Sequence, residues 1–287
     1  MLQNQIQVDI AFLGLAQNCS KYLPKFFDVI KDISLSKNVE VLIGENGSND
    51  YTFEVIQKNI DVNNKITFVD TTFIEQFPDR IKRLALARQK LKNYLIDRNI
   101  NPKFVCVVDL DNVLNENFNS DLINDLSIIL EKNDDKYFGV SLSSKPYYYD
   151  ILNFESDEFP NKGVKQLQNN RSIKSYNARK KYIYDMQKSL TKKTSFDCIS
   201  GFNGLCLYTY KDFIQSDYFE DNEDPTPEHL YLNRILFVKT GKKILVTNNL
   251  LRMPQEHKPL DNIFLFIAEK LYKYISIYYR KFRFRKL

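Results

Sequence analysis

The feature that most constrains the fold is a run of five apolar residues, Phe104–Val108, that ends directly on an Asp-Leu-Asp sequence at 109–111. A strand with one solvated face alternates apolar and polar residues, whereas a strand covered on both faces does not. The run therefore predicts a central strand of a parallel sheet with helices on both faces. Because the two acids follow the strand at once, we expect them at the carboxyl edge of that sheet.

Apolar runs alternate along the chain with segments whose apolar residues recur at helical spacing, which predicts a doubly wound α/β fold. We expect one domain over residues 1–260, divided into halves at 1–144 and 145–260, and a separate tail at 261–287. Residues 145–195 are polar, rich in Tyr and Lys, and predict no definite elements. Strands are expected at 8–16, 39–43, 65–69, 104–108, 138–142, 205–208 and 243–247, and helices at 20–33, 52–59, 81–96, 121–132, 227–240 and 260–279.

The net charge of +5 comes from the end of the chain. Residues 269–287 hold seven of the 41 Lys and Arg residues but only one of the 36 acidic residues. The near-neutral remainder argues against a surface that coats nucleic acid, so no nucleic-acid partner is expected. The four cysteines form no C-x-x-C pair, and the first residues lack a basic and then apolar leader, so we expect a cytoplasmic protein.

The tail combines an apolar helical face with a basic aromatic end, which is typical of a helix that lies on anionic lipid. We therefore expect peripheral attachment to the inner face of a membrane. A helix docked on the protein body and an RNA-binding tail are the alternatives. The apolar face consists of Ile263, Phe264, Phe266, Ile267, Leu271, Tyr274, Ile275 and Tyr278.

Three loops follow the carboxyl ends of predicted strands, at 14–20, 44–52 and 109–117, and we expect them to meet around one ligand. Asp109 and Asp111 can both turn toward a single hard cation there. Mg²⁺ or Mn²⁺ would take one or two carboxylates together with diphosphate oxygens of a substrate. The cation would then offset the charge that develops on a leaving diphosphate. The alternative is a surface turn with solvated acids.

These residues resemble the GT-A glycosyltransferases, including the bacterial enzymes of family 2. The likeness lies in the order of Glu45-Asn-Gly-Ser-Asn-Asp50, a helix, an Arg-rich helix over 80–98 and Val107-Val-Asp-Leu-Asp111. The run from Asp79 to Arg88 also resembles a helix of fungal capsule-associated mannosyltransferases. The likeness covers residues 8–115 well and 196–257 more loosely, and it implies a GT-A fold, a nucleotide-sugar donor and a divalent metal.

The resemblance also implies roles for residues of the first half. Asp109 would lie near the ribose or the metal, and Asp111 would coordinate the metal. Glu45, Asn46 and Asp50 would line the nucleotide pocket, although such enzymes often carry D-D-x-S-x-D where this chain has Glu45-Asn46. A plain Asn-Gly turn is the alternative for this loop.

Three arginines lie on the helix that precedes the strand ending at Asp109. Arg80 and Arg83 share a helix face, and Arg88 is expected off that face. One of them would form a bidentate bond to a phosphate, unless the face is simply solvated.

The second half offers further site residues by resemblance. The turn around Gly201 and Asn203 would lie beside the donor sugar, since glycine lets backbone approach a ligand closely; an ordinary tight turn is the alternative. Glu228, with Asp224 as second choice, would deprotonate the acceptor hydroxyl, or Glu228 would only cap its helix. His257 would be a third metal ligand or an exposed loop residue.

These observations favour a metal-dependent glycosyltransferase that moves a sugar from a nucleoside diphosphate to a hydroxyl of a glycan or lipid-linked glycan, as in the synthesis of surface polysaccharide or lipopolysaccharide. A nucleotidyltransferase also needs acids and metal on an α/β sheet, but it usually has a glycine-rich basic loop after its first strand, which Leu13-Gly-Leu-Ala-Gln-Asn18 lacks. A non-catalytic membrane-surface adaptor with a transferase fold is the third possibility, and the two acids at 109 and 111 argue against it.

If the protein attaches to a membrane through its tail, as we expect, the tail should provide the affinity for lipid. Residues 1–260 should lose co-sedimentation with liposomes that contain anionic lipid, because both the apolar face and the basic cluster are removed. The full chain is the positive control, and neutral liposomes test the contribution of charge. Equal sedimentation of the full and truncated chains would contradict the expectation.

Overall fold

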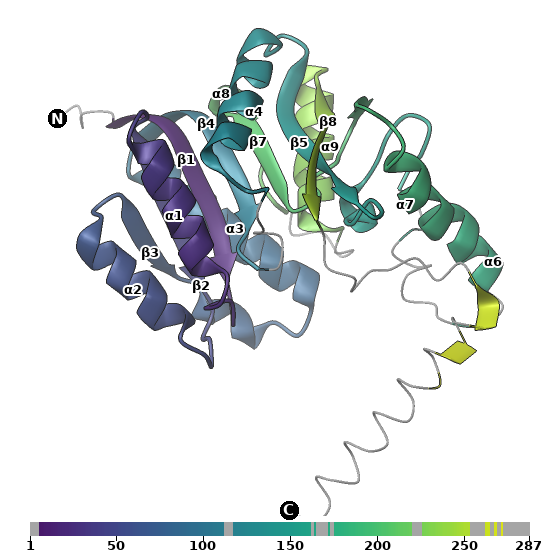
Figure 1. Cartoon of the computed structure of the whole chain (residues 1–287), viewed down its shortest axis with the longest axis horizontal. Coiled ribbons are helices and arrows are strands. Elements are labelled where there is room, and N and C mark those ends of the chain that lie inside the picture. Colours follow the sequence, from purple (N-terminus) through teal and green to yellow (C-terminus); the bar gives the residue numbers. More distant parts are fainter. Residues whose placement is uncertain are drawn as a thin grey trace, which may run out of the picture.

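The computed structural model describes residues 6–111, 117–161, 164, 172, 175–219, 226–252, 262–264, 267–268 and 271. Within this part of the chain, strands from both halves of the sequence form one sheet in the order β3-β2-β1-β4-β7-β5-β8-β6 (Figure 1). The strands are β1 (Ile6–Ala16), β2 (Val39–Glu45), β3 (Ile66–Asp70), β4 (Ile100–Asp109), β5 (Tyr137–Lys145), β6 (Phe196–Cys198), β7 (Leu205–Thr209) and β8 (Lys243–Arg252).

The sheet is mostly parallel, as the alternation of strands and helices predicted. β1 pairs in parallel with β2 and β4, β2 with β3, and β5 with β8. The exceptions are β7, which runs antiparallel to β4 and β5, and β6, which runs antiparallel to β8. The first four strands therefore form a unit of order 3-2-1-4, whose carboxyl ends share one edge.

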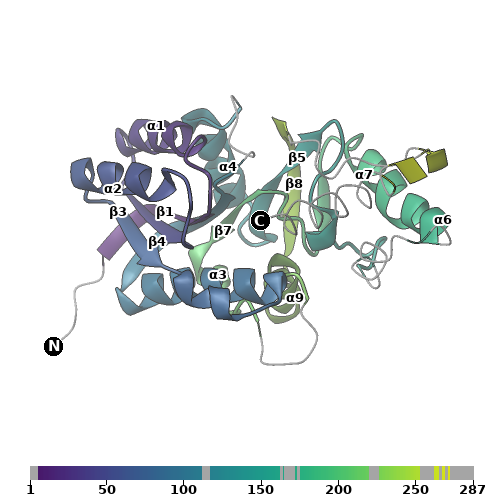
Figure 2. The ribbon, with the colours of Figure 1, turned by 90° about the horizontal axis from the view of Figure 1, so that it is seen from below.

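Helices cover both faces of the sheet (Figure 2). Helices α1, α2 and α4 lie on one face, while α3 and α9 lie on the other. The sheet is therefore the middle of three layers, which explains why the run Phe104–Val108 of β4 is apolar throughout. The helices on the two faces are α1 (Leu23–Ser34), α2 (Thr52–Val62), α4 (Ser120–Lys132), α3 (Arg80–Asp97) and α9 (Glu228–Thr240), and the short α8 (Tyr210–Phe213) follows β7.

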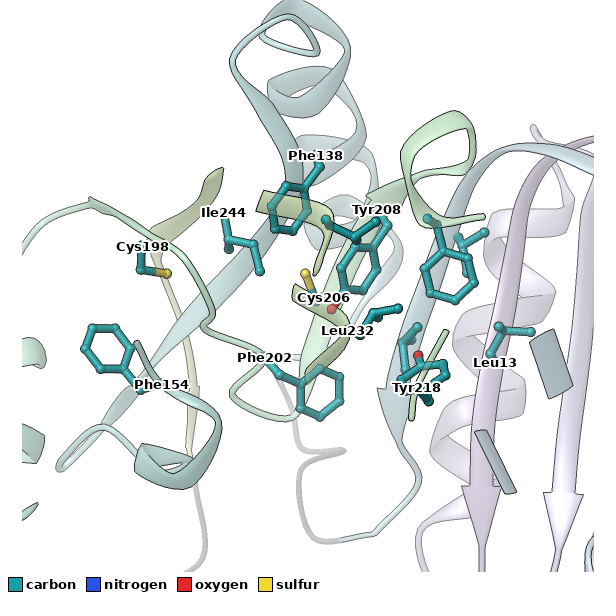
Figure 3. Close-up of a cluster of buried hydrophobic side chains, with 14 of the residues drawn as sticks. Leu13, Phe138, Phe154, Cys198, Phe202, Cys206, Tyr208, Tyr218, Leu232 and Ile244 are labelled. Carbon is teal, nitrogen blue, oxygen red and sulfur yellow. The ribbon is translucent and has the colours of Figure 1, made fainter. Parts of the chain in front are cut away.

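The side chains of β4 confirm the prediction of a strand covered on both faces. Phe104, Cys106 and Val108 pack into the core beneath α1 and α4, while Val105 and Val107 pack into the opposite core. All five are at most 5% exposed. Figure 3 shows part of the second core, where Phe202 and Tyr218 lie at the end of an aromatic cluster that also contains Phe138 and Tyr208.

Residues 145–195, for which the sequence predicted no definite elements, contain a helical run on the side of the sheet where β8 and the edge strand β6 lie (Figure 1). Its buried face includes Arg179 and Gln187 among Ile183, Tyr184 and Leu190. Polar residues on the inner face, together with a π-helical stretch that departs from the 3.6-residue period, hide the helical pattern. The run consists of α6 (Tyr176–Arg179), η4 (Lys180–Tyr184) and α7 (Asp185–Leu190), and short 3₁₀ helices lie at η1 (Thr72–Gln76) and η2 (Ile151–Asn153).

The predicted helix at 260–279 lies largely outside the described residues. Of the predicted apolar face, Ile263, Phe264 and Leu271 are exposed. Within the part of the chain that the structure describes, no helix has the length and apolar character needed to cross a membrane.

The core around α1 yields a stability prediction. Phe26 is fully buried and contacts the rings of Phe12 and Phe118, with centroid distances of 6.2 Å. Phe26→Ala should lower the free energy of unfolding by about 3–5 kcal/mol, because it removes buried area and leaves a cavity. Phe264→Ala, at a position that is 77% exposed, is the matched control and should change it by less than about 0.5 kcal/mol. Denaturant titration measures both, and equal effects would contradict the assignment of Phe26 to the core.

Candidate active site

The carboxyl ends of β1, β2 and β4 lie level with one another. Ala16 pairs with Glu45, and Leu15 pairs with Asp109. The loops that follow these strands enclose a cavity of about 350 Å³, as the sequence predicted for ligands of an open α/β sheet. Its polar and charged lining comprises Gln17, Asn46, Thr71, Arg80, Arg83, Arg88, Asp109, Asp111, Tyr149, Asp150, Asn153, Glu228 and His229.

Asp50 joins the first two loops to each other. Its carboxylate accepts hydrogen bonds from the hydroxyl of Ser20 at 2.7 Å and from that of Thr52 at 2.5 Å, and from both backbone amides. Partial burial alone would raise the pKa of Asp50, but these hydrogen bonds lower it to about 2. Asp50 is not part of the cavity lining, so its role in the structure is to fix the loops that line it.

Glu45 and Asn46 have different roles, since Glu45 supports its own turn and Asn46 lines the cavity. The buried carboxylate of Glu45 accepts hydrogen bonds from the backbone amides of Gly47 and Ser48 at 3.1 and 2.6 Å, and thus closes its own turn. Asn46 lines the cavity, and its buried side-chain oxygen has no hydrogen-bond partner among the described residues. Of the two, only Asn46 is placed to contact a ligand directly.

All three arginines of α3 line the cavity. Arg80 is exposed and Arg83 is half-buried, whereas Arg88 is 4% exposed. Arg88 lies off the helix face that Arg80 and Arg83 share, yet it lines the same cavity. Arg88 is further around the helix, on its buried side, but its long side chain brings the guanidinium to the same wall.

The guanidinium of Arg88 connects two carboxylates from distant parts of the chain. Its Nη2 lies 2.7 Å from Oδ1 of Asp109, and its Nε lies 3.5 Å from Oε1 of Glu228. The guanidinium also lies over the ring of Phe202, 5.3 Å from the centroid. Burial alone would lower the pKa of Arg88, but the two carboxylates raise it, so the group stays charged.

Asp109 and Asp111 lie in the cavity wall, as predicted, but in different environments. The side chain of Asp109 is 29% exposed, whereas Asp111 is exposed to solvent. Burial raises the pKa of Asp109 to about 7, Arg88 opposes this, and the charges of Asp111 and Asp150 add to it. This end of the cavity therefore holds more negative charge than Arg88 neutralises.

His229, which follows Glu228, is enclosed by aromatic rings. Its imidazole stacks on Phe202 with the centroids 3.5 Å apart, and it meets the ring of Tyr218 edge-on at 5.7 Å. Burial and the neighbouring Arg88 hold the pKa of His229 well below its usual range, so the ring is neutral. Neither ring nitrogen has a hydrogen-bond partner among the described residues.

The loop after β5 supplies a part of the cavity wall that the sequence did not predict. Tyr149, Asp150 and Asn153 all line the cavity. Burial raises the pKa of Asp150 to about 6, although a hydrogen bond from Asn153 opposes the shift. The available signal was an acid in the loop after the predicted strand at 138–142, but Asp150 lies eight residues beyond that strand, whereas Asp109 follows its strand directly.

The turn at 200–204 supports this loop, and Gly201 and Asn203 in it do not belong to the cavity lining, whereas Phe202 does. Gly201 has no room for a side chain, since a Cβ atom would lie 2.7 Å from Sγ of Cys198. Asn203 is fully buried with a φ of 47°, and its side-chain oxygen accepts hydrogen bonds from the backbone amides of Tyr149 and Asp150. Their expected place beside a donor sugar is therefore revised: both residues shape the loop that carries Asp150.

Two predicted site residues, Asp224 and His257, lie outside the described residues. Among the residues that the structure describes, no three His, Cys, Asp or Glu side chains form a group arranged to hold a metal ion. Within this part of the chain, Asp109 and Asp111 are therefore the acids available at the predicted position.

Comparison with known proteins bears on the fold. No protein-family model matches the chain, and no curated protein matches its sequence. The structure is similar to that of glucosyl-3-phosphoglycerate synthase from Mycobacterium tuberculosis in complex with Mn²⁺, uridine diphosphate and glucosyl-3-phosphoglycerate, with a TM-score of 0.51, 12% identity, and coverage of 94% of this chain and 79% of the other. A second structure of that enzyme has a TM-score of 0.50 and 12% identity, and the match covers 89% of this chain and 75% of the other.

A more distant match is TarS 1–349 from S. aureus, with a TM-score of 0.45 and 9% identity. The match covers 84% of this chain, which spans 60% of the length of the TarS structure. The two synthase structures establish that the chain has a GT-A fold. The comparisons do not support the likeness to fungal capsule-associated mannosyltransferases.

The network of Arg88 predicts a pH-dependent loss of stability. Arg88→Met should lower the free energy of unfolding at pH 7 by about 3–5 kcal/mol, because it leaves two carboxylates buried without their cation. Burial raises the pKa of Asp109 to about 7 in the native chain, and loss of Arg88 would raise it further. The contact with Arg88 stabilises the ionised form of Asp109, so the deficit of the variant should widen as the pH rises through 7 and narrow below it.

Denaturant titrations in EDTA at several pH values measure this deficit. Arg80→Met, at an exposed position of the same helix, is the matched control and should have little effect. A deficit that is independent of pH, or equal for the two variants, would contradict the account of Arg88.

Proposed function

We propose that the protein is a metal-dependent glycosyltransferase that moves a sugar from a nucleoside diphosphate donor to a hydroxyl of a glycan or lipid-linked glycan. The observation that carries the proposal is the carboxylate pair at the end of β4, which shares one cavity with three arginines of α3. Carboxylates suit a divalent cation, and guanidinium groups suit phosphate oxygens. The GT-A fold places both beyond the carboxyl ends of the strands, where such sheets bind ligands.

The carboxylates present fit Mn²⁺ or Mg²⁺. The raised pKa of Asp109 reflects its burial and the neighbouring acids, and a divalent cation would neutralise that excess of negative charge. Oδ1 of Asp109 is already bound to Arg88, so the exposed carboxylate of Asp111 would be the main protein ligand, with Asp109 beside it. The metal would offset charge on the leaving diphosphate. His257 remains a proposed additional ligand.

The arginines would bind the donor diphosphate. Arg80 and Arg83 reach the cavity without a carboxylate partner among the described residues, so their guanidinium groups are available for phosphate oxygens. Arg88 is engaged by Asp109 and Glu228, which makes it part of the wall. The structural neighbour in complex with Mn²⁺ and uridine diphosphate supports a nucleoside diphosphate and a divalent metal as the groups to test first.

We further propose that the protein works in the cytoplasm at the inner face of a membrane, held by the tail. The exposure of Ile263, Phe264 and Leu271 supports this proposal, because these apolar side chains are available for contact with lipid. An acceptor linked to lipid would then be presented at the surface to which the enzyme is bound.

Asp111→Ala tests the proposed function directly. Release of nucleoside diphosphate from a panel of sugar nucleotides, with water as acceptor, should require Mn²⁺ or Mg²⁺. The variant should lose at least about 100-fold in this rate, which corresponds to about 2.7 kcal/mol of transition-state stabilisation. Asp125→Ala, at an exposed acid on α4, is the matched control and should behave like the native chain. The absence of metal-dependent turnover, or equal rates for native and Asp111→Ala, would refute the proposal.

A further inference from the structure

The proposed transfer requires a group that takes the proton of the acceptor hydroxyl, if the sugar is transferred with inversion. Glu228 was expected in this role, but its surroundings argue against it. Its side chain is only 6% exposed, and its Oε1 lies 3.5 Å from Nε of Arg88 and 3.7 Å from Nε2 of His229. A base must come within hydrogen-bond distance of the hydroxyl, and this carboxylate is enclosed by protein and engaged by a guanidinium.

Asp150 has the features that Glu228 lacks. It is half-buried, lines the cavity, and has no ion-pair partner among the described residues. One carboxylate oxygen, Oδ2, accepts a hydrogen bond of 2.7 Å from the side chain of Asn153. The backbone amide of Asn153 also donates to this carboxylate, and the carboxylate lines the cavity, where a substrate can reach it.

The position of Asp150 is fixed from two sides. Its backbone amide donates to the side chain of Asn203 at 3.0 Å. Asn153, which holds Oδ2, also accepts a hydrogen bond of 3.1 Å from the backbone amide of Leu230 in the first turn of α9. The carboxylate is thus anchored to the turn before β7 and to the helix that carries Glu228, so it is pre-organised as a catalytic group needs to be.

Both the location and the pKa of Asp150 suit a general base. Its charge is among those that raise the pKa of Asp109, so it lies near the proposed metal end of the cavity. It belongs to the second half of the chain, where the acceptor is expected to bind. Burial raises the pKa of Asp150 to about 6, near the value that suits a base at neutral pH.

We propose that Asp150 is the general base of the transfer. Its carboxylate accepts the proton of the acceptor hydroxyl while the hydroxyl oxygen forms a bond to the anomeric carbon of the donor sugar. The bond from this carbon to the β-phosphate oxygen breaks, and its electron pair leaves with the nucleoside diphosphate. The anomeric configuration is therefore inverted. Asn153 and Asn203 act as positioning residues for Asp150. This inference rests on the proposed function.

Hydrolysis of sugar nucleotides tests the inference without knowledge of the acceptor, because water takes the place of the hydroxyl. The native chain is assayed with Mn²⁺ and UDP-glucose, UDP-galactose, UDP-N-acetylglucosamine and GDP-mannose, and the donor with the highest turnover is used. Asp150→Asn should lower turnover at saturating donor by about 10²–10⁴-fold. The Kd for UDP or GDP, measured by calorimetry, should stay within about threefold of the native value.

Three further readouts separate a base from a structural residue. Asp125→Asn, at an exposed position on α4, should match the native chain. The turnover of the native chain should fall below about pH 6, while the residual turnover of Asp150→Asn should not follow this limb. Added formate should partly restore Asp150→Ala, since a small carboxylate can enter the space and accept the proton.

The outcomes distinguish the inference from the function on which it rests. No turnover of any donor by the native chain would refute the proposed function, and the inference with it. Native turnover together with an Asp150→Asn rate within tenfold of native would refute the inference alone. The inference alone would also be refuted if NMR shows that the sugar first released has the anomeric configuration of the donor.

Discussion

The arrangement of the site depends on one buried cation. Arg88 reaches from the inner side of α3 to Asp109 at the end of β4 and to Glu228 at the start of α9. Without it, two carboxylates from opposite halves of the chain would be buried without a cation, which costs about 3–5 kcal/mol. With it, β4 from the first half of the chain and α9 from the second half are held at one wall, and Phe202 and His229 pack beside the guanidinium.

Much of the fold can be predicted from the pattern of apolar and polar residues along the chain. The absence of alternation in 104–108 predicted a strand covered on both faces, and β4 sends its side chains alternately into two cores. The loops after β1, β2 and β4 were expected together because parallel strands end at one edge. Residues 145–195 escaped prediction because the buried face of their helical run carries Arg179 and Gln187, and because a π-helical stretch breaks the period.

The site could be predicted only in part, because the sequence indicates where a side chain lies but not which other side chains it binds. Sequence spacing located Asp109, Asp111 and the arginines in the cavity, but it did not show which groups bind each other within the protein. Asp50 and Glu45 turn out to fix loops, and Arg88 is engaged by two acids. Asp150 stands out only once the chain is folded, when Asn203 and Asn153 hold it at the wall. The segment that was least interpretable in sequence thus supplies the proposed base.

The central claim is that one cavity, at the carboxyl edge of the first four strands, binds both a divalent metal and a nucleoside diphosphate. A crystal structure of the full chain grown with Mn²⁺ and UDP tests it most directly, since manganese is located by its anomalous scattering. The account predicts one manganese peak at the carboxylates of Asp109 and Asp111, with the diphosphate beside it and within reach of Arg80 or Arg83. Nucleotide bound elsewhere, or a manganese peak away from these two carboxylates, would contradict it.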